Sequence, residues 1–194
     1  MTNQEIRCTA GNIELRDASE ESEHLIEGYA LKFDTWSENL GGFKETITRK
    51  ALDKTDFSDV RALFNHNADH VLARSSAGTL HLDVDDIGLK FRFQVPETTY
   101  GKDLLENIRN GNVSQCSFGF QIAKDGDAIE YDNEDKIYKR SLNDIERIVD
   151  ISAVTYPAYK DTEVGPALRS IDAINELEQR QRELDKLKLR IKLL

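Results

Sequence analysis

The sequence predicts a mainly β (α+β) protein with one globular domain and a C-terminal helical tail. Short runs in which apolar and polar residues alternate recur through most of the chain, as in strands with one buried face. From Ile171 the apolar residues instead recur at three-, four- and seven-residue spacings in a charged background, which is typical of an amphipathic helix. We therefore expect a polar N-terminal segment (1–24), a β domain (25–168) and a helix (169–194).

Composition excludes several classes of function. The formal net charge of −10 argues against non-specific nucleic-acid binding, which needs a basic surface. The chain has two cysteines, Cys8 and Cys116, too few for a disulfide framework or a four-cysteine metal site, which favours a reducing compartment. No apolar run reaches membrane-spanning length and the N-terminus does not resemble a signal peptide, so we expect a protein used inside a cell.

The β domain is expected to begin with a series of short strands. A weak pattern at Asn12–Arg16 precedes them, and a short helix interrupts them at Thr48–Lys54. The strands that the alternation predicts are Leu25–Phe33, Phe43–Ile47 and Val60–His66.

The next segment predicts a hairpin followed by a helix. Leu80–Val84 and Leu89–Val95 alternate clearly and are joined by a tight turn. Thr98 or Thr99 can cap a helix over Tyr100–Asn110, which the following Gly111 ends. The acidic stretch 124–136 is expected to be an exposed loop or hairpin tip, and Ile145–Tyr156 a strand buried on both faces.

Asn112–Phe120 contains the most informative pattern. In a strand, Ser114, Cys116 and Phe118 would share an apolar face, and Ser117 would share the opposite face with Gly119. A glycine there leaves room for a close neighbour. This placement suits a nucleophilic serine, although a small strand residue near a turn is the commoner case.

A serine nucleophile needs a base and a group that orients the base. His66 ends a predicted strand and has the pKa range that suits a general base, but a structural histidine is the commoner case. Asp150 lies in the most apolar strand, where an unpaired carboxylate is costly. Its alternative is a structural ion pair with Arg147 or Arg61.

Other chemistries fit the residues less well. His66 and His70 have the spacing of a zinc-binding helix, but Asn67 stands where that motif has glutamate. Gln115 stands where a nucleophile elbow has glycine. Cys116 is expected to face the core, so it is not the nucleophile.

The ordered set of motifs resembles the tailed-phage prohead serine proteases, which are distantly similar to the herpesvirus assemblin proteases. The resemblance covers about Ile26 to Ala158. The segments that carry it are Leu63-Phe64-Asn65-His66, Gly88-Leu89, Gly111 to Phe120, and Val149-Asp150 to Pro157-Ala158.

The resemblance implies a closed antiparallel β-barrel flanked by helices, with Ser117 as nucleophile and His66 as base. Asp150 matches an acidic third position that is more usually glutamate, so Glu146 is the alternative. The function implied is a serine endopeptidase that matures the prohead, cleaving scaffold segments of the capsid protein and itself. It implies no cofactor and no metal.

The implied setting is the host cytoplasm, inside the assembling prohead, with the major capsid protein and its scaffold segment as partners and neither nucleic acid nor a membrane involved. The tail is expected to contact scaffold or capsid subunits or a second copy of itself, or else to pack on the domain. The alternative function is a non-catalytic assembly protein that keeps the protease fold; a small-substrate esterase or amidase is a third.

Overall fold

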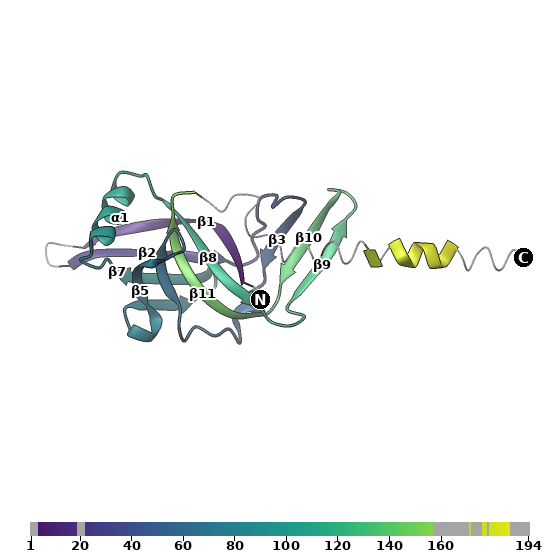
Figure 1. Cartoon of the computed structure of the whole chain (residues 1–194), viewed down its shortest axis with the longest axis horizontal. Coiled ribbons are helices and arrows are strands. Elements are labelled where there is room, and N and C mark those ends of the chain that lie inside the picture. The colour runs from purple at the N-terminus through teal and green to yellow at the C-terminus, as the bar shows by residue number, and fades with distance from the viewer. Residues whose placement is uncertain (1–3, 19–21, 157–170, 172–175, 178, 187–194) are drawn as a thin grey trace, which may run out of the picture.

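The computed structural model of the protein describes residues 4–18, 22–156, 171, 176–177 and 179–186. Strands dominate these residues, which confirms the prediction of a mainly β protein with few helices. They form one eight-stranded and one three-stranded sheet, which lie side by side in Figure 1. The helix α1 (Thr99–Arg109) lies at the end of the large sheet away from the small one.

The large sheet has the order β5-β4-β11-β8-β1-β2-β7-β6. All of its ladders are antiparallel except that between β4 and β11. Its strands are β1 (Gln4–Ala18), β2 (Ser22–Lys32), β4 (Arg61–Phe64), β5 (Asn67–Arg74), β6 (Leu80–Val84), β7 (Gly88–Gln94), β8 (Gln115–Ile122) and β11 (Ile145–Val154).

The small sheet has the order β3-β10-β9 and packs at one end of the large sheet. Its strands are β3 (Phe43–Ile47), β10 (Ile137–Leu142) and β9 (Asp127–Asp132). β9 and β10 form a hairpin, so the acidic stretch 124–136 is partly strand and partly the exposed turn that joins the two.

β1 joins the two halves of the large sheet. Gln4–Thr9 pairs with β8, the register breaks between Thr9 and Asn12, and residues from Ile13 onward pair with β2. Residues 4–18 are therefore strand of the main sheet, although their pattern suggested a separate polar segment. The apolar pattern is weak because Glu5 and Arg7 are buried in an ion-pair network.

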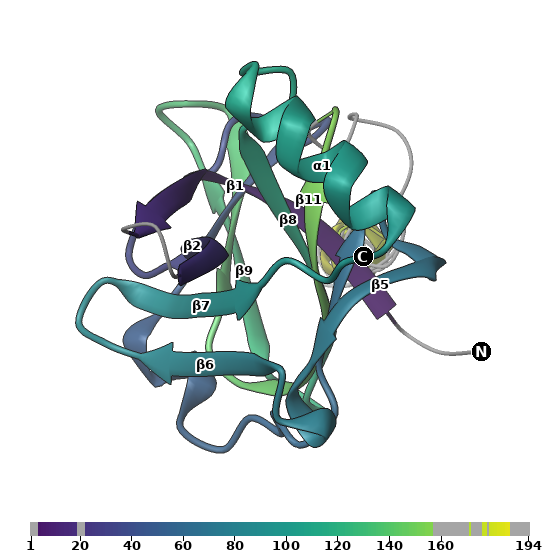
Figure 2. The ribbon, with the colours of Figure 1, turned by 90° about the vertical axis from the view of Figure 1, so that its left-hand side faces the viewer.

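The expected closed barrel is wrong. The sheet curls around its core, as Figure 2 shows end-on, but among the described residues no ladder joins its edge strands β5 and β6. A group from outside the sheet binds β5: the Tyr100 hydroxyl of α1 donates to the Val71 carbonyl. β6 therefore pairs only with β7 in the described sheet, and the seam stays open.

Several local predictions are confirmed. The hairpin of β6 and β7 forms, and Thr98 caps α1 by accepting a hydrogen bond from Gly101 N. Gly111 follows the helix with φ of 72°, a conformation that glycine adopts readily. Around the expected helix Thr48–Lys54 the chain forms only a short 3-10 turn, η1 (Arg49–Leu52).

The core lies inside the curled sheet and beneath α1. Its fully buried side chains include Phe91, Phe118, Phe120, Leu31, Leu89 and Leu104. Among the described residues, no helix is long and apolar enough to cross a membrane.

A second apolar cluster, on the small sheet, includes a residue of the C-terminal segment. Ile171 is buried beside Phe43, whereas Leu177 and Leu184 are 67% and 46% exposed. The other expected apolar positions of the tail, Ile174, Leu187, Ile191 and Leu194, lie outside the described residues.

Candidate active site

Ser117 lies near the start of β8, on the face opposite the apolar side chains of that strand. Cys116, Phe118 and Phe120 are fully buried in the core, as the alternation predicts. Ser117 is itself 0% exposed, with His66 and the Arg7 carbonyl in contact with its hydroxyl. Across these ladders it is paired with Ser152 of β11 and Cys8 of β1.

His66 lies in the two-residue turn between β4 and β5. Asn65 and His66 both have positive φ, 53° and 54°, as in the type I′ turns that suit tight hairpins. The turn is attached to β11: Asn65 N donates to the Ala153 carbonyl, and the Asn65 side chain accepts from Thr155 N. This attachment directs the His66 ring toward Ser117.

Asp150 is buried in β11, directly across the ladder from Gly119. A Cβ at Gly119 would overlap Asp150 Oδ1, so the glycine leaves room for this carboxylate. The sequence suggested that the glycine admits a neighbouring backbone; the neighbours are instead the side chains of Asp150 and Gln4.

These three side chains form a continuous hydrogen-bonded chain. His66 Nε2 lies 2.8 Å from Ser117 Oγ, and His66 Nδ1 lies 2.6 Å from Asp150 Oδ2. A carboxylate only accepts hydrogen bonds, so Nδ1 carries a proton and, in the neutral ring, Nε2 is the acceptor. This is the order of groups through which a histidine removes a proton from a serine.

The alternatives to this role of Asp150 fit the structure less well. Arg61, one of its two possible ion-pair partners, pairs with Asp59 at 3.1 Å. Glu146, the alternative acidic member, is exposed on the same strand. The structure therefore brings Asp150, not Glu146, to His66. The described residues contain no cluster of His, Cys, Asp and Glu suited to a metal ion.

Ser152 also belongs to this site, and sequence reasoning did not identify it. Its Oγ donates to Asp150 Oδ2 at 2.8 Å and accepts from His66 N at 3.2 Å. It thereby fixes both the carboxylate and the turn that holds the histidine. Its two-residue spacing from Asp150 in a strand places both side chains on one face, and this parity is the signal that was available.

A groove of about 610 Å³ is lined by parts of β2, β6 and β7 together with Phe57 and Ser75, and none of Ser117, His66 and Asp150 lines it. The His66 side chain is 21% exposed, whereas Ser117 is fully covered.

Comparison with known proteins identifies the family of the chain. Residues 11–177 match the caudovirus prohead serine protease family. The chain belongs to this family. The match spans the three site residues and the strands that carry them, and it begins within β1.

Two further comparisons accompany this assignment. This member of the prohead protease family is similar to the solved structure of the bacteriophage T4 capsid assembly protease, with 13% identity and a TM-score of 0.49. That similarity covers 78% of this chain and 96% of the T4 chain. No curated protein matches the sequence.

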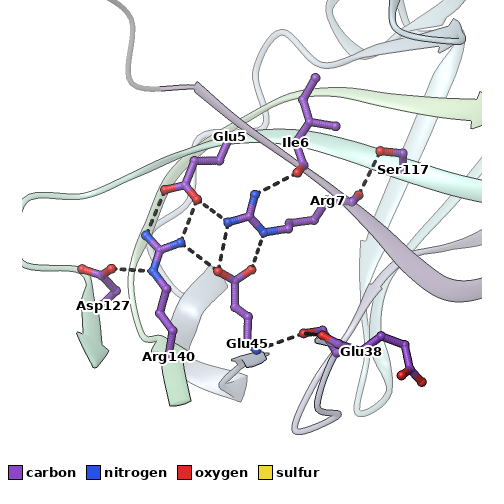
Figure 3. A network of polar contacts seen from close by, with 9 residues as sticks. Glu5, Ile6, Arg7, Glu38, Glu45, Ser117, Asp127 and Arg140 are labelled. Atoms are coloured by element: carbon purple, nitrogen blue, oxygen red, sulfur yellow. Dashed lines mark hydrogen bonds and ion pairs between the residues drawn. The ribbon is translucent and has the colours of Figure 1, made fainter. Parts of the chain in front are cut away.

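A buried ion-pair network lies beside the candidate active site of this family member (Figure 3). Arg7 binds Glu45 at 2.8 Å and Glu5 at 2.5 Å, and Arg140 binds Glu5 and Glu45 at 2.7 and 2.8 Å. Asp127 completes it at 2.7 Å from Arg140.

This network changes the acidity of its members. Burial raises the pKa of Glu5, but hydrogen bonds and charge from Arg140 and Arg7 outweigh it, and the net pKa is lowered. Burial also lowers the pKa of Arg140, yet its carboxylate partners raise it overall. Glu5 and Arg7 come from β1, whereas Glu45 and Arg140 come from the small sheet, so the network fastens β1 to that sheet.

Proposed function

We propose that the protein is a serine endopeptidase that matures phage proheads, with Ser117 as nucleophile, His66 as general base and Asp150 as the group that orients His66. The observation that carries this proposal is the hydrogen-bonded chain from Ser117 through His66 to Asp150, at 2.8 and 2.6 Å. Membership of the prohead serine protease family supports it.

The residues suggest the following steps. His66 Nε2 takes the Ser117 proton as Oγ attacks the scissile carbonyl carbon, and Asp150 stabilises the imidazolium that forms. His66 then gives the proton to the leaving amine, which leaves an acyl group on Ser117. Water, activated by His66, hydrolyses this ester. General-base assistance contributes about 10²–10⁴ to the rate.

The proposed substrates are scaffold segments of the major capsid protein and the protease chain itself, cleaved inside the assembling prohead in the host cytoplasm. The partners are the capsid protein and its scaffold segment, and the C-terminal helix contributes a contact with them or with a second copy of the chain. The mechanism needs no cofactor.

Co-expression with the capsid protein of the same phage tests the proposal. We expect the unaltered chain to shorten the capsid protein and Ser117→Ala to leave it intact, as measured by mass spectrometry. Ser114→Ala is the matched control, because Ser114 is exposed just before β8. We expect this control to retain processing.

The same variants, assayed also on small esters, address the alternatives. Processing that persists in Ser117→Ala would remove Ser117 as the nucleophile. Proheads that assemble with uncleaved capsid protein in every variant would favour the non-catalytic assembly protein. Turnover of small esters without preference for an extended peptide would favour a small-substrate hydrolase.

A further inference from the structure

The hydroxyl of Ser117 has two neighbours that compete for its single proton. His66 Nε2 lies 2.8 Å from Oγ, and the carbonyl oxygen of Arg7 lies 3.0 Å from it (Figure 3 shows the Arg7 contact). A hydroxyl donates one hydrogen bond, so a proton directed at Arg7 is not available to His66. The arrangement thus lowers the nucleophilicity of Ser117.

The segment that supplies this carbonyl also occupies the space beside the nucleophile. Gln4–Thr9 runs antiparallel to β8, with Cys8 opposite Ser117 and Ile6 opposite Gly119. Extended peptides bind proteins by adding a strand to a sheet edge in this way. Attack by Oγ requires a substrate carbonyl at about 3–3.5 Å, where the Arg7 carbonyl now lies.

The contacts of Gln4–Thr9 allow it to leave as a unit. A register break between Thr9 and Asn12 separates its pairing with β8 from that of Asn12 with Gln115, and Ile13 N donates to the Ser114 carbonyl and holds the next part of β1. Departure would free the β8 edge and leave the other ladders of the sheet intact.

Departure of Gln4–Thr9 would also leave no buried charge unpaired, either on the departing segment or on the small sheet. Glu5 and Arg7 pair with each other and leave together, while Arg140 keeps Glu45 and Asp127. A buried charge that lost every partner would cost several kcal/mol, and this division avoids that cost.

We propose that Gln4–Thr9 is a cis-acting inhibitory strand in the substrate site, and that substrate enters by replacing it along β8. This inference rests on the proposed role of Ser117 as the nucleophile. The site selects an extended peptide with an acidic residue two positions before a basic one. Arg140 receives the acidic side chain; Glu45 and the face of Phe120, 5.7 Å from the Arg7 guanidinium, receive the basic one.

The reactivity of Ser117 toward a fluorophosphonate probe tests the inhibitory strand in the full-length protein. Arg7→Glu places a carboxylate against Glu45 and should release the strand. The labelling rate should then rise about tenfold or more, in proportion to the fraction of molecules in which Gln4–Thr9 has left β8. Arg7→Lys keeps the charge but loses the paired bonds to Glu45, so labelling should rise less than in Arg7→Glu. An unchanged rate in folded Arg7→Glu would overturn the proposal.

A crosslink provides the converse test without removing a buried charge. Gln4 and Gln121 face each other across the ladder, so Gln4→Cys with Gln121→Cys offers a disulfide that holds the strand on β8. We expect the oxidised protein to resist the probe and the reduced protein to recover the starting rate. Equal labelling of the two forms would show that the strand does not block access of the probe to Ser117.

Peptide binding separates this inference from the proposed function, because it needs no catalysis. A labelled peptide of residues 2–10 should bind Arg7→Glu/Ser117→Ala at least about tenfold more tightly than Ser117→Ala alone. A peptide with the acidic and basic residues exchanged should bind the double variant weakly. If no variant processes capsid protein but the peptides bind in this pattern, the proposed function fails and the peptide site along β8 stands. Equal binding of the two peptides would overturn the peptide site.

Discussion

Gly119 of β8 and Asp150 of β11 are partners across an antiparallel ladder, and the Asp150 carboxylate occupies the space that a side chain at position 119 would need. The carboxylate is held by His66 and Ser152, so it has little freedom to move aside. The smallest residue in the strand thereby determines where the acidic member of the site lies.

Gly119→Ala should therefore impair catalysis more than folding. The added methyl group displaces Asp150 and with it the orientation of His66, for which we expect a fall in kcat/KM of about 10²-fold or more on a capsid-derived peptide. Asp150→Asn is the comparison, with an expected loss of up to about 10⁴. Full activity in folded Gly119→Ala would contradict this role of the glycine.

Ser152→Ala should reduce kcat while leaving KM nearly unchanged. The change removes the donor to Asp150 Oδ2 and the acceptor for His66 N, so the two side chains lose a common support. We expect a loss of unfolding free energy of about 1–3 kcal/mol for the groups left unpaired. The pH profile of kcat should shift as well, which a purely structural serine would not cause.

Asn65 should show separable backbone and side-chain effects. Asn65→Gly keeps the positive φ without strain but loses the bonds to Thr155, whereas Asn65→Ala loses these bonds and strains the turn. In urea unfolding we expect the alanine variant to be less stable than the glycine variant by about 1 kcal/mol. Equal stability of the two would argue against strain at this turn.

Glu5 should make the protein sensitive to acid. Its folded-state pKa is lowered, so its contribution is fully present above the unfolded pKa of about 4.3 and is lost as the pH falls through the lower folded value. Asp59 and Asp132 have lowered pKa values too, so the difference between proteins is the informative quantity. Stability should fall less steeply below about pH 4 in Glu5→Gln than in the unaltered chain; parallel curves would contradict the role of Glu5.

Ending the chain after Ile171 should separate assembly from cleavage. Ile171 keeps its contact with Phe43, while the exposed Leu177 and Leu184 are removed. We expect peptide cleavage to persist and recovery of the protein with proheads to fall. A truncated chain that fails to fold would favour packing of the tail on the domain instead.

Strand parity was the most reliable guide from the sequence. It separated Ser117 from Cys116 and Phe118, and the structure places these residues on opposite faces of β8. The chemistry of proton transfer then pointed to His66 and Asp150, which the structure brings to Ser117 from a turn and a strand far away in the sequence. Their roles stay a prediction until activity is measured.

The features of the fold that the sequence did not predict share a physical cause. In each, polar groups are paired with partners that are distant in the sequence. β5 is half exposed and alternates poorly, and the N-terminal half of β1 buries charges that local pattern assigns to solvent. Barrel closure depended on whether the β5 edge was available, and Val71 is occupied by Tyr100 of a later helix. No local pattern reports such long-range pairing.

The order of the chain has a consequence for synthesis in the cell. Arg7 leaves the ribosome 110 residues before Ser117, the residue whose hydroxyl it contacts. At about 5–20 residues per second, this interval is roughly 5–20 s, during which the first strand has no β8 to join. Gln4–Thr9 has already been made when Ser117 leaves the ribosome. A newly made chain therefore forms β8 and covers its nucleophile in the same folding step.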